Sequence, residues 1–226
     1  MFDEEFFKDA KYTVITHNDA DGVLCLTAFL KSIDENEYMS VRSYFTTPVR
    51  VREVICASTL GQKCELGSLC VFDLTANRCA IIASAMYKDA IWIDHHKWEK
   101  IDILNEKGEF LSVKTVVDTN SLSAASLVSR YYKVSTGLES YIDEIDKNRV
   151  KTEEAKKIRD VIGAIKYAYT GLDLSDKLSE LAFGLVRLGI DELKDKNIWI
   201  VGLDVKGDKK YNEINYPEKV ALVVGN

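Results

Sequence analysis

The stretch YTVITHNDADG, residues 12–22, indicates how the rest of the sequence is organised. It begins with a short apolar run, typical of a buried strand, and His17, Asp19 and Asp21 follow at once. The same order recurs further along: SLCVF (68–72) precedes Asp73, AIWI (90–93) precedes Asp94, His95 and His96, and LSVKTVV (111–117) precedes Asp118. Each run therefore ends in residues that can bind metal or carry protons.

Helical patterns separate these runs, namely DGVLCLTAFLKSI, VREVICASTL, ANRCAIIASAMY and SAASLVSRYY. Strands that alternate with helices predict an α/β fold with a mostly parallel sheet flanked by helices. Apolar spacing predicts two further helices within residues 152–170 and 175–193. We expect one domain over residues 1–195. The strand-like runs NIWIVGL and KVALVV predict a short α/β appendage at 196–226, a reduced or incomplete second domain.

Composition narrows the classes of function. The 226 residues carry a net charge of −6, which argues against a protein that coats long nucleic acid but is compatible with a small anionic substrate. No apolar stretch approaches the roughly 20 residues that a membrane span needs, and the start MFDEEFF is acidic where a signal peptide would be basic. We expect a cytoplasmic protein with no membrane contact; a homodimer is left open.

Carboxylates and imidazoles gather at the ends of the predicted strands. An aspartate between a strand and a helix is often a helix cap, and Asp21, Asp73 or Asp118 alone could be one. Capping explains neither the His-x-Asp-x-Asp spacing nor the adjacent His95 and His96. All three histidines of the chain belong to this set. Because ligands bind at the carboxyl ends of parallel strands, the set predicts a metal site.

Spacing within the first stretch suggests how two ions would be shared. Alternate side chains of an extended segment point to the same side, so His17 and Asp19 can face one metal and Asp21 a second. Gly22 lets the chain turn into the helix. Asp73, arriving from the neighbouring strand, can bridge two ions, which lie about 3.5 to 4 Å apart in two-metal hydrolases.

Three segments resemble the motifs of the DHH phosphoesterase family, which includes single-strand exonucleases and short-oligonucleotide hydrolases. THNDADGV resembles the first motif, VFDLTANR the second, and IDHHK the motif that names the family. The resemblance covers residues 10–150. It implies hydrolysis of short oligonucleotides or small nucleotide phosphoesters, in which water attacks phosphorus beside two manganese ions. Cobalt, zinc or magnesium are substitutes suited to the same ligands.

The resemblance also implies roles for individual residues. One manganese is held by His17, Asp19 and Asp73, and the other by Asp21, Asp73, His95 and a fourth-motif aspartate. Asp94 orients His95, and His96 points to the scissile phosphate. In YIDEIDKNRV the fourth-motif aspartate is Asp143 or Asp146, with Asp146 preferred and Asp118 less favoured. Asn120, Ser121 and Ser123 open a helix whose amides could receive a phosphate, or form an ordinary cap.

The carboxyl end departs from the family pattern. Family enzymes carry a second domain with a glycine-rich, histidine-bearing motif, whereas no histidine follows His96. The tail also resembles a fragment of the trefoil-knotted RNA methyltransferases. The main alternative to an enzyme is a non-catalytic docking module in a nucleic-acid complex, like helicase subunits related to this family. Inorganic pyrophosphatase relatives are a further alternative, although their first histidine stands farther from the aspartate pair.

Overall fold

The computed structural model describes residues 10–60, 66–195, 199–203 and 220–224. Its main sheet has the strand order β2-β1-β3-β4-β6-β5, and every pairing is parallel except the one between β5 and β6. The strands are β1 (Tyr12–His17), β2 (Val41–Thr46), β3 (Ser68–Phe72), β4 (Asp89–Asp94), β5 (Glu109–Phe110) and β6 (Val113–Val117). The predicted α/β fold with a mostly parallel sheet is confirmed.

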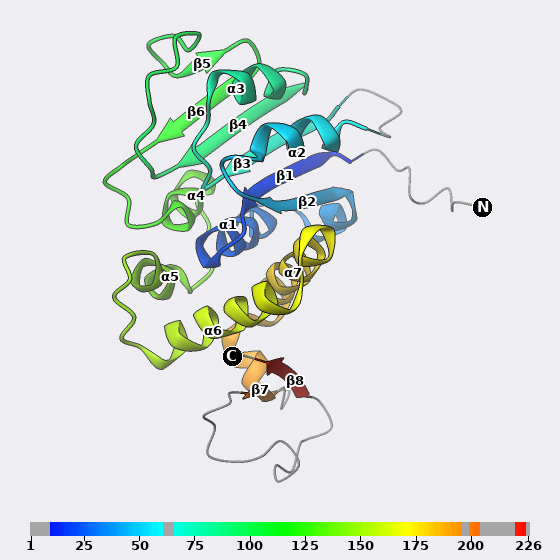
Figure 1. The fold of residues 1–226 in the computed structure, drawn as a ribbon, viewed down its shortest axis with the longest axis vertical. Helices are drawn as coiled ribbons and strands as arrows, with labels where there is room; N and C mark the ends of the chain where they lie inside the picture. The colour runs from blue at the N-terminus through cyan, green and yellow to red at the C-terminus, as the bar shows by residue number, and fades with distance from the viewer. Residues whose placement is uncertain (1–9, 61–65, 196–198, 204–219, 225–226) are drawn as a thin grey trace, which may run out of the picture.

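Helices cover both faces of this sheet (Figure 1). They are α1 (Ala20–Lys31), α2 (Val51–Ser58), α3 (Arg78–Ser84), α4 (Ala124–Tyr132), α5 (Glu139–Asp146), α6 (Glu153–Ala168) and α7 (Gly171–Asp195). One core lies beneath α1, α4 and α7, and the other beneath α2 and α3. Successive residues of β1 show the division, since Val14 packs in the first core and Ile15 in the second.

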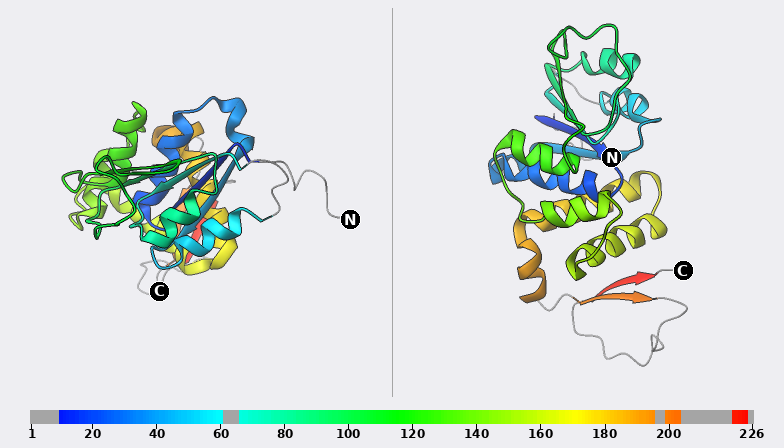
Figure 2. Two further views of the ribbon diagram at one scale, coloured as in Figure 1. Left: turned by 90° about the horizontal axis from the view of Figure 1, so that it is seen from above. Right: turned by 90° about the vertical axis from the view of Figure 1, so that its left-hand side faces the viewer.

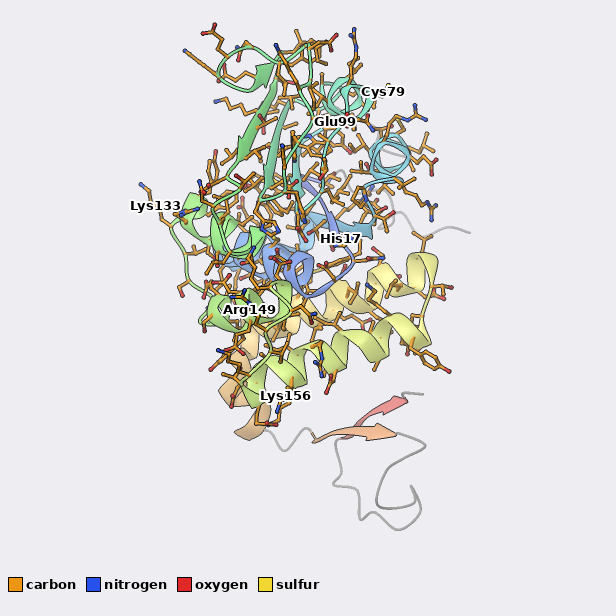
Figure 3. All side chains as sticks on the ribbon, turned by 60° about the vertical axis from the view of Figure 1, so that its left-hand side comes forward. His17, Cys79, Glu99, Lys133, Arg149 and Lys156 are labelled. Carbon is orange, nitrogen blue, oxygen red and sulfur yellow. The ribbon has the colours of Figure 1, made fainter. Side chains whose placement is uncertain are left out.

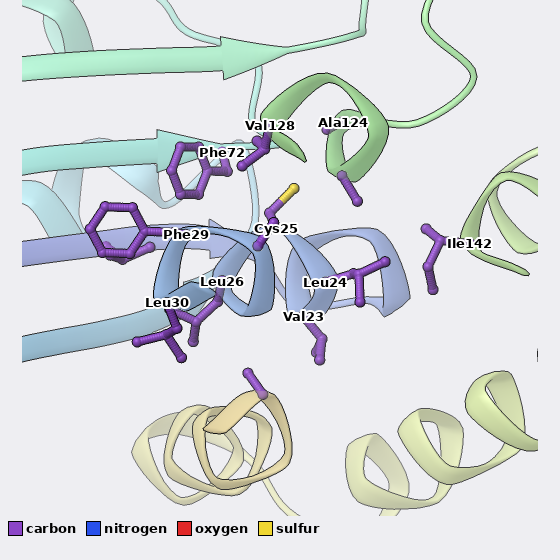
Figure 4. Close-up of a cluster of buried hydrophobic side chains, with 14 of the residues drawn as sticks. Val23, Leu24, Cys25, Leu26, Phe29, Leu30, Phe72, Ala124, Val128 and Ile142 are labelled. Carbon is purple, nitrogen blue, oxygen red and sulfur yellow. The ribbon is translucent and has the colours of Figure 1, made fainter. Parts of the chain in front are cut away.

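The larger core surrounds α1, where residues 20 to 30 are all buried. Figure 4 shows Phe29 and Phe72 between α1 and the sheet, with Val128 of α4 above them. Ile142 of α5 lies at the N-terminal end of α1, facing Leu24 (Figure 4). A helix that is apolar on every side must be buried on every side. Because α1 meets that need against four other helices, its first turn, which bears Asp21, is held rigidly.

Three elements differ from the expected pattern. The 3-10 helix η2 (Glu35–Ser40) has a mostly polar sequence without apolar periodicity, and β5 has two residues, so neither could be recognised from spacing. Helix α7 begins at Gly171, four residues before the start predicted at residue 175.

The tail contains a separate parallel pair of strands, β7 (Trp199–Leu203) and β8 (Val220–Val224), as the apolar runs predict. In Figures 1 and 2 this pair lies beyond α6, apart from the main sheet. The remainder of the predicted appendage lies outside the described residues. No helix in the described part of the chain is long and apolar enough to cross a membrane.

Candidate metal centre

The candidate site lies where the topology of the sheet reverses. From β1 the chain crosses to the edge strand β2 and then returns past β1 to β3, so the carboxyl ends of β1 and β3 flank the point of reversal. In open α/β sheets ligands bind at this point. His17 ends β1, and Asp73 follows β3 directly. Figure 3 shows His17 where the sheet meets the helical layer.

The turn from β1 into α1 depends on Gly22. A Cβ on Gly22 would lie 1.9 Å from the backbone oxygen of His17, so no other residue fits without moving the backbone. The Gly22 amide donates to Asp19 Oδ1 at 3.0 Å, which makes Asp19 the cap of α1. Asp19 therefore caps the helix with one oxygen while its other oxygen faces the site. Asp21, expected in an extended loop, instead lies in the first turn of α1.

His17, Asp19 and Asp73 form the first group of possible ligands. His17 Nδ1 lies 2.5 Å from Asp19 Oδ2 and 3.7 Å from Asp73 Oδ2. One ligand atom from each residue lies within 4.8 Å of the others, a spacing that can hold a metal ion. These are the three residues predicted for the first metal.

Asp21, His95 and Asp146 form a second group with the same spacing. His95 Nε2 lies 3.6 Å from Asp21 Oδ2, 3.8 Å from Asp146 Oδ2 and 3.7 Å from Asp73 Oδ1. Asp73 thus turns one oxygen toward His17 and the other toward His95. The carboxylate of Asp73 stands between the two groups, as a bridging ligand would.

Two buried atoms in this cluster test whether a metal would fit. Asp73 Oδ1 and His95 Nε2 are buried and have no hydrogen-bond partner among the described residues, although they lie 3.7 Å apart. An unpaired buried polar atom costs about 1–3 kcal/mol, so it calls for an explanation. A divalent cation between them would satisfy both atoms, and a mixed nitrogen and oxygen donor set suits manganese and its neighbours. The residues therefore fit the predicted metal.

Backbone geometry at Asp73 points the same way. Asp73 has φ +55°, in the left-handed region that non-glycine residues seldom adopt, and its amide donates to Ile93 O at 3.0 Å. Aspartate tolerates this conformation better than most residues. Strain of this kind gathers at functional sites, where the surrounding structure maintains it.

The charges of the cluster are unbalanced without cations. Burial raises the pKa of Asp21 to about 8, even though the Ala124 and Ala125 amides both donate to its carboxylate at 2.7 Å. Burial likewise raises the pKa of Asp73 well above its usual range, and nearby carboxylates add to the effect. Burial opposes ionisation of Asp19 too, but there the hydrogen bond with His17 prevails and lowers the pKa. Burial lowers the pKa of His95, which favours its neutral, metal-binding form.

Asp94 holds His96, which corrects the expectation that it orients His95. Asp94 Oδ1 accepts from His96 Nδ1 at 2.8 Å and from the His96 amide at 3.2 Å. Neighbouring residues after a strand point to opposite sides, so Asp94 and His96 share one side while His95 turns to the carboxylates. The His95 ring is instead hydrogen-bonded to the Ser121 backbone. The hydrogen bond to Asp94 raises the pKa of His96, whose side chain is 51% exposed.

The fourth-motif candidates separate clearly. Asp146, at the end of α5, faces His95, whereas Asp143 accepts hydrogen bonds from Ser123 Oγ at 2.5 Å and Ser126 Oγ at 2.9 Å. Asp118 pairs with Arg130 at 3.0 Å and belongs to none of the candidate ligand groups. Asp146 is therefore the candidate whose position fits a ligand, in line with the preference from the sequence.

At the segment predicted either to receive a phosphate or to form an ordinary cap, Ser123 caps α4, since its hydroxyl oxygen accepts from the Ser126 amide at 3.2 Å. Ser121 and Ser123 are buried, with hydroxyl groups that donate to the Ser123 carbonyl and to Asp143. The amides of Ala124 and Ala125, in the first turn of α4, are bound by Asp21. Asn120 remains exposed. Substrate contact by these residues stays a prediction.

Sequence reasoning missed three groups that complete the site. The α4 amides that hold Asp21 come from more than 100 residues away, so no local pattern could reveal them. Trp98 and Thr75 both donate to Asp94 Oδ2, at 2.5 and 3.4 Å. A possible signal was the position of Trp98, four residues after Asp94, since a tryptophan in a polar segment must place its N–H somewhere.

Comparison with known proteins identifies the fold. No protein-family model and no curated protein matches the sequence. Among solved structures, the pGpG-specific phosphodiesterase PggH from Vibrio cholerae is similar with a TM-score of 0.50 and 15% identity, over 81% of this chain and 56% of that chain. The chain thus spans little more than half the length of that protein.

Two further structures are similar at lower TM-scores, which add no argument. An uncharacterized protein from Helicobacter pylori G27 has a TM-score of 0.46 and 18% identity, over 83% of this chain and 60% of that chain. The exonuclease RecJ bound to manganese has a TM-score of 0.41 and 14% identity, over 81% of this chain and 57% of that chain. The similarity to the pGpG-specific phosphodiesterase, at 15% identity, bears on the fold alone, and it agrees with the DHH phosphoesterase fold that the three motifs predict.

Proposed function

We propose that the chain is a metal-dependent hydrolase that cleaves short oligonucleotides or small nucleotide phosphoesters. One observation carries the proposal: Asp73 Oδ1 and His95 Nε2 are buried, 3.7 Å apart and without a hydrogen-bond partner among the described residues. Both residues belong to the candidate ligand groups, of which a third joins Asp73 and His95 to Asp94 and His96. In a core held together by packing alone, two buried polar atoms without hydrogen bonds would only destabilise the fold. A non-catalytic docking module would have no need of such a pair either.

In this proposal His17, Asp19 and Asp73 hold one manganese, and Asp21, Asp73, His95 and Asp146 hold the other. When bound, the two ions would lower the pKa of a water molecule between them and neutralise charge on a phosphoryl group. Asp73 supplies one oxygen to each side of the pair. The amides of α4 hold Asp21 in place.

His96 has a separate role, as donor to the substrate. Its Nδ1 is committed to Asp94, so Nε2 is the nitrogen left for a phosphoryl or leaving oxygen. The hydrogen bond to Asp94 raises the pKa of His96 and so favours the protonated ring. His96 can then stabilise developing charge or protonate the leaving group.

Substrate size follows from two supports. The chain has a net charge of −6, and a negatively charged protein is poorly suited to binding a long nucleic-acid strand. The similar phosphodiesterase is named for pGpG, a short nucleotide. We therefore propose dinucleotides and nucleotide bisphosphates as substrates, with Asn120 as the exposed member of the proposed substrate-binding segment.

The test is hydrolysis by the purified chain with manganese, assayed on pGpG, 3',5'-bisphosphate nucleotides, pyrophosphate and labelled single strands. We expect turnover on the short nucleotides. His96→Ala should keep its manganese and lose about a hundredfold in turnover. Absence of turnover with manganese, cobalt, zinc or magnesium would instead favour the docking module. Loss of metal from His96→Ala would make His96 a ligand.

A further inference from the structure

Trp98 binds the carboxylate that holds His96. Its indole Nε1 donates to Asp94 Oδ2 at 2.5 Å, while Asp94 Oδ1 accepts from His96 Nδ1 at 2.8 Å. Asp94 is fully buried. A buried carboxylate must have its oxygens paired, and the remaining donor to Oδ2, the Thr75 hydroxyl, lies farther away at 3.4 Å. The indole N–H is therefore the principal partner of Oδ2.

The core holds Trp98 in place. Its ring packs edge-on against Trp92, with ring centroids 5.8 Å apart and planes at 89°. Trp92 is fully buried, and its own Nε1 donates to Ser84 Oγ at 3.0 Å. Both tryptophans thus have fixed positions, and a rigid donor meets Asp94 from the side away from His96.

This arrangement restricts the rotation of the carboxylate. With Oδ2 bound to the indole, Oδ1 must face His96 Nδ1. That contact fixes the plane of the His96 ring and keeps a proton on Nδ1, so that Nε2 of the protonated ring carries the proton offered to the substrate; carboxylates hold histidines in this way in other active sites. The His96 side chain is 51% exposed, and its ring contacts the His95 ring edge-on with centroids 4.3 Å apart, a contact that leaves open which nitrogen faces the substrate.

We propose that Trp98 is a positioning residue that acts through Asp94 to fix the ring of His96 for reaction. The catalytic part of this inference, an effect on kcat, rests on the proposed function. It names a residue outside the three motifs.

Trp98→Phe tests the proposal because it removes the N–H donor and keeps an aromatic ring against Trp92. We expect kcat to fall by about 10- to 100-fold, with KM and manganese content unchanged. Tyr87→Phe is the matched control, since it removes an aromatic side chain's hydrogen bond, to Ser58, within the same core. That variant should keep wild-type kcat.

A double variant separates positioning from general damage. If Trp98 acts through His96, adding Trp98→Phe to His96→Ala should lower kcat no further. A further fall by the whole factor seen for Trp98→Phe alone would overturn the proposal. So would wild-type kcat in Trp98→Phe.

NMR spectroscopy tests the contact without requiring activity. The chain has three tryptophans, so Trp98→Phe identifies one indole N–H signal among three. That signal should move upfield in Asp94→Asn, because an amide oxygen is a weaker acceptor than a carboxylate. The ring signals of His96, assigned with His96→Ala, should shift in Trp98→Phe. Unchanged His96 signals would overturn the inference, whereas an inactive wild type with shifted signals would overturn only the proposed function.

Discussion

Proton release on metal binding follows directly from the charges of the site. Asp21 is 2% exposed, and burial raises its pKa to about 8, so at pH 7 about nine-tenths of the metal-free molecules carry a proton there. A metal ligand must lose that proton. Burial also raises the pKa of Asp73, so this carboxyl group adds to the release. We expect manganese binding at pH 7 to release at least about one proton per chain.

Calorimetry in two buffers of different ionisation enthalpy measures this number. The proton released by Asp21 should fall to about a tenth at pH 9, above its pKa. Asp21→Asn should release about one proton fewer than the wild type at pH 7. Asp118→Asn is the control, since Asp118 pairs with Arg130 outside the ligand groups. Release of less than about half a proton by the wild type would refute the reasoning.

The same shift sets the pH dependence of stability in the metal-free chain. Since the folded-state pKa of Asp21 lies above the unfolded value, near 3.8, the folded chain binds the extra proton between that value and about 8. The contribution of protonated Asp21 to the free energy of unfolding is therefore complete below about pH 4 and is lost as the pH rises through about 8. Other groups add their own slopes, so the comparison is between variants. Between about pH 5 and 8, the Tm of the metal-free wild type should fall more steeply than that of Asp21→Asn.

Three further predictions concern single residues. Asp73→Asn should lose both manganese and activity while its circular dichroism spectrum shows that it stays folded, because asparagine tolerates the left-handed backbone at this position. Retained activity would argue against a shared ligand. Asp146→Asn should weaken one of two manganese-binding events in a titration, whereas Asp143→Asn should keep both and lower the Tm, because its partners lie in α4. Lys166→Gln should raise KM for a nucleotide several-fold with kcat retained, because the positive charge of Lys166 interacts with Asp19 and so lies near the site. An unchanged KM would mean that Lys166 does not contact the substrate.

The sequence predicts the fold well because the relevant signals are local. Each strand is a short apolar run, and His17, Asp73 and His95 follow the runs directly. Parallel strands bring their carboxyl ends to one edge, so nearness along the sheet could be inferred without any contact information. The elements that escaped prediction carry no such signal: η2 is polar, and β5 has two residues.

The contacts that hold the candidate ligands in place depend on tertiary packing and could not be predicted from local sequence patterns. Asp21 was expected in an extended loop, but the burial of α1 carries it into the first turn, where its carboxylate meets the amides of α4. That meeting depends on how two helices pack, and strand-end patterns do not encode it. The partner of Asp94 was likewise predicted wrongly from the sequence. Because side chains alternate at the strand end, the Asp94 carboxylate binds His96 and not the adjacent His95. Local patterns can therefore predict which residues reach the site, whereas tertiary packing decides which of them hold one another in place.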